Sequence, residues 1–271
     1  MMKRFLVALA LGALPFAASA AVTVKGSDTM VILAQRWAEE YMKQNPGKKV
    51  QVTGGGSGIG IAALINGTTD VANASRPIKK DEQAKVRDRY NVLPTETAVA
   101  QDGVAIYVHA ASAIQQLTVE QLRSIYNGDV TNWKDVGGPD EKIVLYSREN
   151  SSGTYVFFKD NVLQGDDFAA HAQTLPGTAA VVNAVSKERH GIGYGGAAYA
   201  KGVKEVKIVG KDGQGWLPTA ENVASGKYPL ARPLFMYTRG KPSGEVAAFL
   251  AYCLSPAGQA IVTKVGYFPI R

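Results

Sequence analysis

Thr53-Gly54-Gly55-Gly56-Ser57-Gly58-Ile59-Gly60 separates an expected strand at residues 49–52 from an expected helix at residues 59–66. The glycines let the backbone turn tightly and approach a ligand closely. The helix start that follows presents N–H groups without intrahelical partners, at the positive end of the helix dipole. The stretch therefore predicts an α/β unit with a turn suited to an anion, and an ordinary glycine turn with a capping serine is the alternative.

A second stretch has the same design: Ser147-Arg148-Glu149-Asn150-Ser151-Ser152-Gly153-Thr154-Tyr155. Arg148 follows an expected strand at residues 142–146, and Ser152 and Gly153 precede a helix expected at residues 154–163. An arginine offers two parallel donors to a tetrahedral oxyanion, and hydroxyls and amides add further donors. A third, weaker example is Gly26-Ser27-Asp28-Thr29-Met30. Together they predict an oxyanion receptor rather than an enzyme, whereas a surface arginine beside a capped helix is the alternative.

Strand-like and helix-like segments alternate along the chain, which predicts an α/β fold with largely parallel sheets. Strands are expected at residues 22–24, 49–52, 70–74, 104–108, 142–146, 192–194, 206–209 and 234–237. Helices are expected at residues 29–44, 59–66, 81–89, 118–126, 154–163, 178–187, 242–254 and 256–265. Because ligands bind at the carboxyl ends of strands, two facing sheets would place both anion loops on one cleft. We expect residues 21–103 and 233–271 to form one lobe and residues 104–232 the other.

The first 20 residues are typical of an export signal. Lys3 and Arg4 precede an apolar run at residues 5–16, and Ala18-Ser19-Ala20 is a small-residue cleavage site. A membrane anchor is the alternative, but the run is too short to span a bilayer. We expect cleavage after Ala20 and a periplasmic protein. Loss of the two basic residues lowers the formal net charge from +7 to +5.

Composition excludes several other classes. The basic residues are dispersed and do not alternate with aromatics, which argues against nucleic-acid binding. The mild positive charge fits attraction of small anions, although solubility alone is the simpler explanation. The single cysteine, Cys253, can form no internal disulfide, and we expect a small buried hydrophobe.

The candidate enzyme motifs in this sequence lack the residues or the context that each motif requires. Gly191-Ile192-Gly193-Tyr194-Gly195-Gly196 matches G-x-G-x-x-G, but its context favours a tight strand and turn over a dinucleotide site. Ser57 lacks the last glycine of a nucleophile elbow, because Ile59 occupies that position. The histidines at positions 109, 171 and 190 are too scattered for a local metal motif. We therefore expect no catalytic residue, no metal and no cofactor.

The constellation of motifs resembles the periplasmic phosphate-binding protein of the high-affinity bacterial phosphate ABC transporter, the Pst system. The resemblance covers residues 21–271. Its most specific parts are Gly26-Ser27-Asp28-Thr29, Gly54-Gly55-Gly56-Ser57-Gly58, Asp70-Val71-Ala72-Asn73-Ala74-Ser75-Arg76 and Arg148-Glu149-Asn150-Ser151-Ser152-Gly153-Thr154. Supporting matches are Gly191-Ile192-Gly193-Tyr194 and Tyr228-Pro229-Leu230-Ala231-Arg232-Pro233-Leu234.

The resemblance implies a two-lobed periplasmic-binding-protein fold of type II that closes over one phosphate. It places the phosphate contacts on Thr29, the Met30 amide, Ser57, Ser75, Arg148, Ser152, Gly153 and Thr154. It also implies an inner-membrane ABC permease complex as partner. We expect a monomer.

One position departs from part of the family. Some members carry an aspartate where this chain has Ser75, and that carboxylate accepts the proton of phosphate and so rejects sulfate. Here Asp28 and Glu149 are the nearest candidate acceptors, and we favour Asp28.

The leading hypothesis is reversible capture of inorganic phosphate. A binding protein for another oxyanion, such as sulfate or molybdate, is the first alternative. A secreted phosphatase that uses Ser57 or Thr29 is the second, although the sequence offers it neither a metal cluster nor a neighbouring base.

Overall fold

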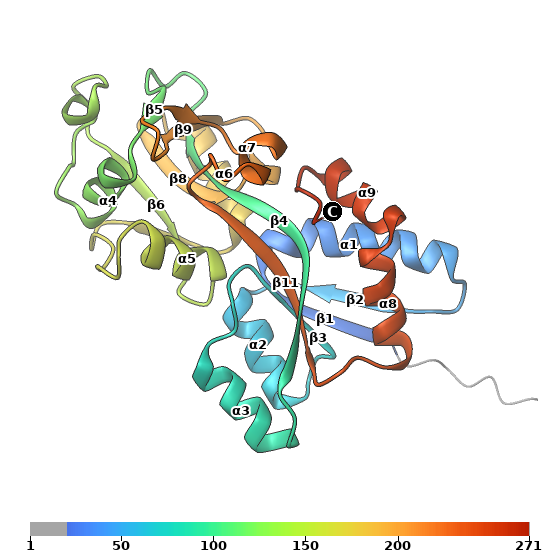
Figure 1. Cartoon of the computed structure of the whole chain (residues 1–271). Coiled ribbons are helices and arrows are strands. Elements are labelled where there is room, and N and C mark those ends of the chain that lie inside the picture. The colour runs from blue at the N-terminus through green and yellow to red at the C-terminus, as the bar shows by residue number, and fades with distance from the viewer. Residues whose placement is uncertain (1–20, 271) are drawn as a thin grey trace, which may run out of the picture.

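Strand β4 (Pro94–Val108) belongs to both halves of this molecule in the computed structural model, which describes residues 21–270. Through Gly103, β4 pairs antiparallel with β11 (Ala231–Arg239). From Val104 onward it pairs antiparallel with β8 (Gly191–Gly196). Figure 1 shows β4 and β11 side by side between two lobes. The expected export signal lies outside the described residues.

The first lobe contains three parallel strands and five helices. Its strands are β1 (Val22–Gly26), β2 (Val50–Thr53) and β3 (Val71–Ala74), and its helices are α1 (Asp28–Gln44), α2 (Ser57–Asn66), α3 (Lys80–Tyr90), α8 (Gly244–Leu254) and α9 (Pro256–Val265). Trp37, Tyr41, Phe249 and Cys253 are among the buried side chains of its core, so Cys253 is a buried apolar residue as expected.

Helices α8 and α9 are apolar and meet at 63°. No single helix of residues 21–270 is long and apolar enough to cross a membrane. Within the same residues, α8 and α9 taken together are the one bent pair with enough length and apolar character to do so. Both helices bury their apolar faces in the core of the first lobe.

The second lobe carries a parallel arrangement of β8, β6 (Val144–Arg148) and β7 (Gln173–Leu175). Its helices are α4 (Val119–Asn127), α5 (Gly153–Asn161), α6 (Gly177–Lys187) and α7 (Ala220–Ala224), with 3-10 turns η1 (Trp133–Val136) and η2 (Ala197–Tyr199). Its short strands β5 (Gln116–Leu117) and β10 (Gly215–Trp216) flank β9 (Lys204–Val209), which also pairs with β4.

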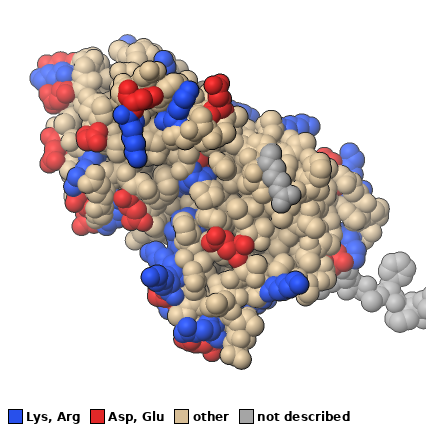
Figure 2. Space-filling model, in the orientation of Figure 1, with Lys and Arg blue, Asp and Glu red and all other residues tan. Residues whose placement is uncertain are grey.

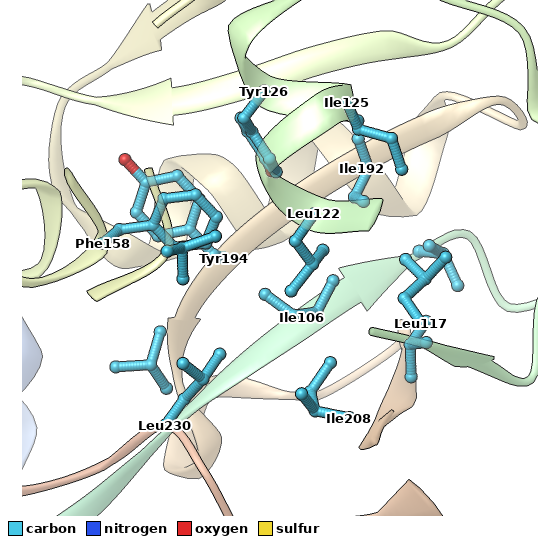
Figure 3. Close-up of a cluster of buried hydrophobic side chains, with 14 of the residues drawn as sticks. Ile106, Leu117, Leu122, Ile125, Tyr126, Phe158, Ile192, Tyr194, Ile208 and Leu230 are labelled. Carbon is cyan, nitrogen blue, oxygen red and sulfur yellow. The ribbon is translucent and has the colours of Figure 1, made fainter. Parts of the chain in front are cut away.

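Buried hydrophobic side chains fill the core of the second lobe, and Tyr126, Phe158 and Tyr194 are its aromatic members labelled in Figure 3. The rings of Phe158 and Tyr194 stack with centroids 4.1 Å apart, and Tyr126 meets both rings edge-on. Offset stacking and edge-to-face contacts are the favoured arrangements of aromatic pairs. Because Phe158 lies on α5 and Tyr194 on β8, this packing fixes α5 against the sheet.

The α/β class and the two-lobed fold are confirmed, and the strands that lead into the predicted anion loops are parallel. The complete sheet is mixed, however, since β11 runs antiparallel to β3 and to β4. Apart from the pair of β9 with β10, the antiparallel strand pairs among residues 21–270 involve β4 or β11, the two strands that run between the lobes. The lobes are thus joined by hydrogen-bonded strands and not by a loose linker.

Most expected elements are present with shifted ends. The expected N-cap Thr118 is confirmed, because its side chain forms a capping box with Gln121. The glycine-rich motif at residues 191–196 forms β8 and leads into η2, which agrees with the expected strand and turn. Strand β4 starts ten residues earlier than expected, at Pro94.

Candidate functional site

The N-termini of α1, α2 and α5 meet between the lobes, where Figure 1 shows α2 and α5 next to the crossing strands. Two hydrogen bonds link the segments at the starts of α2 and α5: the Gly58 amide donates to the Ser151 carbonyl at 2.9 Å, and the Ser151 hydroxyl donates to the Gly55 carbonyl at 3.3 Å. Gly55 and Gly56 have positive φ, as the predicted tight turn requires. The lobes are therefore in contact at the site.

Buried hydroxyl groups from both lobes gather at this junction. In the first lobe, the Ser75 hydroxyl accepts from Ser27 at 3.0 Å and lies 3.4 Å from the Ser57 hydroxyl. The Ser57 oxygen also accepts from the Ser75 amide at 3.0 Å. Across the lobes, the Thr29 and Thr154 hydroxyls are 2.9 Å apart. All five side chains are at most 2% exposed, so their protons are available only to buried acceptors.

Gly153 brings the start of α5 against these hydroxyls. A Cβ atom at this position would lie 2.3 Å from the Ser57 hydroxyl oxygen and 2.7 Å from that of Ser75. Only a glycine allows this approach. The preceding residue, Ser152, caps α5 by accepting from the amides of Thr154 and Tyr155.

Arg148 is almost completely buried, with 1% of its side chain exposed. One terminal nitrogen donates to Asp28 Oδ2 across the lobes and the other to the Thr178 hydroxyl, both at 2.8 Å. Burial lowers the pKa of Arg148, and the nearby Arg232 lowers it further, whereas Asp28 opposes both effects. Its Nε has no hydrogen-bond partner among residues 21–270.

The aromatic core sets the position of Arg148. The Tyr194 hydroxyl, which lies 2.9 Å from the Ser147 hydroxyl, accepts from the Arg148 amide at 3.4 Å. The glycines of β8 let α6 pack closely, since a Cβ at Gly195 would come within 2.5 Å of Thr178. This approach places the Thr178 hydroxyl against the guanidinium.

A second buried arginine, Arg232, lies on β11 opposite Asp102 of β4. Its Nε and Nη2 donate to Asp102 Oδ2 at 3.1 and 2.8 Å, and its Nη1 donates to the Ser75 carbonyl at 3.0 Å. Nη2 also donates to the Thr154 hydroxyl at 3.0 Å, with a longer contact of 3.5 Å to that of Thr29. Complete burial raises the pKa of Asp102, and Arg232 opposes that rise.

The structure thus brings together the predicted residues Thr29, Ser57, Ser75, Gly153 and Thr154, and it joins Arg148 to Asp28. The Met30 amide, also a predicted contact, instead donates to the Ser27 carbonyl at 3.0 Å. Each carboxylate oxygen of Asp28, the preferred proton acceptor, already accepts one hydrogen bond, Oδ1 from the Gly55 amide and Oδ2 from Arg148, both at 2.8 Å, and each can accept another.

Sequence reasoning assigned no role to Ser27, Asp102, Thr178 or Arg232. A signal for two of them was present: Arg232 and Asp102 each stand beside an apolar run, at residues 233–237 and 104–108. A buried charge requires a partner, and two such charges of opposite sign predict each other.

The chemistry of the site is that of an anion receptor with many donors. No group of three or more histidine, cysteine, aspartate or glutamate side chains in the described part of the chain could hold a metal ion.

Figure 2 shows acidic and basic side chains interspersed over one face of the second lobe, with no continuous basic stripe there.

Comparison with known proteins agrees with this geometry. The PBP superfamily domain matches residues 16–257. The phosphate-binding protein PstS of Pseudomonas aeruginosa is 35% identical, over 90% of this chain and 81% of its own length. The chain belongs to the PstS family of phosphate-binding proteins.

Two solved structures of similar proteins extend the likeness to three dimensions. A Clostridium perfringens protein, described as a phosphate ABC transporter substrate-binding protein with bound phosphate, gives a TM-score of 0.84 at 28% identity. The alignment covers 93% of this chain and all of that one. An ABC-type phosphate transport receptor from Vibrio cholerae gives 0.73 at 31% identity, over 91% and 99% of the two chains. The PstS family fold therefore extends over nearly the whole chain.

Proposed function

We propose that this protein captures inorganic phosphate in the periplasm and delivers it to an inner-membrane ABC permease. The observation that carries the proposal is the set of buried donors at the junction of the lobes: hydroxyls from both lobes, three helix N-termini and the Arg148 guanidinium. Membership of the PstS family and the phosphate bound to the Clostridium perfringens relative support the same ligand.

A buried oxyanion requires a donor for each oxygen, because an unpaired buried charge is very costly. Hydroxyls and helix-start amides supply short neutral bonds, and charge-assisted bonds from an arginine are roughly twice as strong. We assign the contacts to Thr29, Ser57, Ser75, Arg148, Ser152, Gly153 and Thr154. The Met30 amide joins them only if it leaves the Ser27 carbonyl.

The test is titration calorimetry of the mature protein with phosphate, sulfate and molybdate. Phosphate should bind most tightly, and tighter binding of another oxyanion would contradict the proposed ligand. Arg148→Ala should weaken phosphate binding at least tenfold, because truncating one partner of a buried charged pair costs on the order of 2–5 kcal/mol. Near-wild-type affinity would remove Arg148 from the site.

Discrimination against sulfate needs an acceptor for the phosphate proton, and we propose Asp28. Its Oδ2 lies 2.8 Å from the Arg148 guanidinium, so a ligand held by Arg148 lies near this carboxylate. Asp28→Asn should therefore lower the preference for phosphate over sulfate. An unchanged ratio of the two affinities would exclude Asp28.

We further propose that the protein acts as a monomer without enzymatic activity and that its leader is cleaved after Ala20. The change of partner of β4, from β11 at Gly103 to β8 at Val104, supports a lobe boundary between those residues. On this division residues 104–232 form the second lobe. Turnover of a chromogenic phosphate ester would contradict the proposed absence of enzymatic activity and would favour a phosphatase.

A further inference from the structure

Arg232 lies on β11, one of the strands that join the two lobes, and its side chain is only 2% exposed. Its guanidinium contacts four segments: β4 through Asp102, the end of β3 through the Ser75 carbonyl, α1 through Thr29 and α5 through Thr154. Figure 1 shows β4 and β11 passing between the lobes where these segments meet. A single side chain therefore contacts both lobes and the connection between them.

The hydrogen bonds of Arg232 set the direction of two hydroxyl groups. A guanidinium only donates, so the hydroxyl of Thr154 must accept at 3.0 Å and that of Thr29 at 3.5 Å. A hydroxyl whose oxygen accepts from a cation turns its own proton away from that cation. The two threonines can share one proton across their 2.9 Å contact, and the other proton points elsewhere.

The planar guanidinium group of Arg232, with its fork of N–H donors, is itself held in place. Asp102 is completely buried and accepts two of its N–H groups through Oδ2, while Phe157 packs against the guanidinium with 5.2 Å between the guanidinium carbon and the ring centre. Charge-assisted bonds of this kind combine strength with fixed direction. The side chain has little freedom to leave the threonines.

We propose that Arg232 is a positioning residue of the anion site: because Thr29 and Thr154 both accept from it, the hydroxyl proton that they do not share is directed toward the bound oxyanion. This inference rests on the proposed function. A hydroxyl can donate or accept, so without Arg232 the same threonines would also suit a protonated ligand oxygen. With Arg232 in place, they favour an oxygen that carries negative charge and no proton.

The test is a double-mutant cycle with Arg232→Lys and Thr154→Val, measured by calorimetric titration with inorganic phosphate. Lysine keeps the charge opposite Asp102 but cannot reproduce the planar fork. Valine keeps the shape of threonine and removes the hydroxyl. If Arg232 acts through the hydroxyl, Arg232→Lys should weaken binding about tenfold in the wild-type background and less than about twofold in the Thr154→Val background.

The control is Arg239→Lys at the far end of β11, where Arg239 donates to the Thr69 carbonyl and does not touch the site hydroxyls. Its phosphate affinity should equal that of the wild type. If Arg232→Lys fails to fold, Asp102→Asn replaces it in the cycle, since it loosens the same fork and should show the same dependence on Thr154.

Additive effects, with equal losses in both backgrounds, would show that Arg232 acts independently of Thr154 and would overturn the inference alone. A lowered melting temperature with unchanged phosphate affinity would assign Arg232 a structural role only and would also overturn it. If the wild type binds no phosphate, the proposed function fails and this inference fails with it.

Discussion

Gly153 is a residue of the site at which the absence of a side chain matters. It starts α5 in the second lobe, and its Cα faces the hydroxyls of Ser57 and Ser75 in the first lobe. A methyl group here would have to push the lobes apart, because the nearest atom would be at 2.3 Å. The contact between the lobes thus depends in part on the missing Cβ of Gly153.

Gly153→Ala should weaken phosphate binding at least tenfold, a change of about 1.4 kcal/mol, without destabilising α5, where alanine is a good helix former. Calorimetry and circular dichroism would measure the two effects. Gly58→Ala provides a graded comparison, since its Cβ would meet the Ser151 carbonyl oxygen at the less severe distance of 3.2 Å. A larger affinity loss for Gly58→Ala than for Gly153→Ala would contradict this steric account.

At the scale of the element, some helices of this protein begin with a side-chain cap and others begin without one. The Ser255 side chain caps α9 by accepting from the Gly258 amide at 3.1 Å. Ser243 occupies the equivalent position before α8 but forms no side-chain cap. The two serines therefore provide a matched pair within one bent pair of helices.

Ser255→Ala should destabilise the protein by about 1 kcal/mol and lower its melting temperature by about 2–4 °C, because one helix-start amide loses its acceptor. Ser243→Ala should change stability by less than about 0.5 kcal/mol. Thermal unfolding followed by circular dichroism measures both. Equal effects of the two substitutions would show that the cap of α9 contributes no stability.

The sequence predicts elements well where the signal is local. Apolar periodicity and capping residues locate most of the helices, and Thr118 is an example of a cap read correctly. The start of β4 is missed because residues 94–97, Pro-Thr-Glu-Thr, are a proline and three polar residues without apolar alternation. Strands of two or three residues, such as β5, β7 and β10, are too short to show periodicity.

The candidate site divides in the same way. Ser57, Arg148 and Ser152 lie where a strand ends or a helix begins, in stretches with a recognisable local design, so the sequence and the family resemblance point to them. Arg232 and Asp102 are 130 positions apart and meet only through the register of β11 against β4. No local pattern specifies that register, which depends on the packing of the complete sheet.

At the scale of the whole molecule, the lobes share strands, and a movement between them must bend paired β-structure. The ion pair of Asp28 with Arg148 and the contact of Thr29 with Thr154 join the lobes in the closed arrangement. Ligands that bind groups from both lobes favour that arrangement over an open one. Phosphate should therefore act on the balance between two positions of the lobes.

Global stability should also depend on pH through Glu205 of β9, which pairs with Tyr107 of β4. Its side chain is half-buried, and Oε1 has no hydrogen-bond partner among residues 21–270. Burial raises the pKa of Glu205 to about 7. The phenols of Tyr107 and Tyr228 are near enough for the carboxylate to raise their pKa values in turn, after the larger effect of burial.

The sign of this dependence follows from proton counting. Between the ordinary glutamate pKa of about 4.3 and the folded-state value of about 7, the unfolded chain loses the Glu205 proton while the folded protein keeps it. The free energy of unfolding should therefore fall as pH rises through this window, with the loss complete above it. Glu205→Gln should remove this part of the slope in urea unfolding measured from pH 4.5 to 8. Glu120→Gln, at an exposed position, should keep the wild-type slope, and an unchanged slope in Glu205→Gln would show that Glu205 ionises as freely in the folded protein as in the unfolded chain.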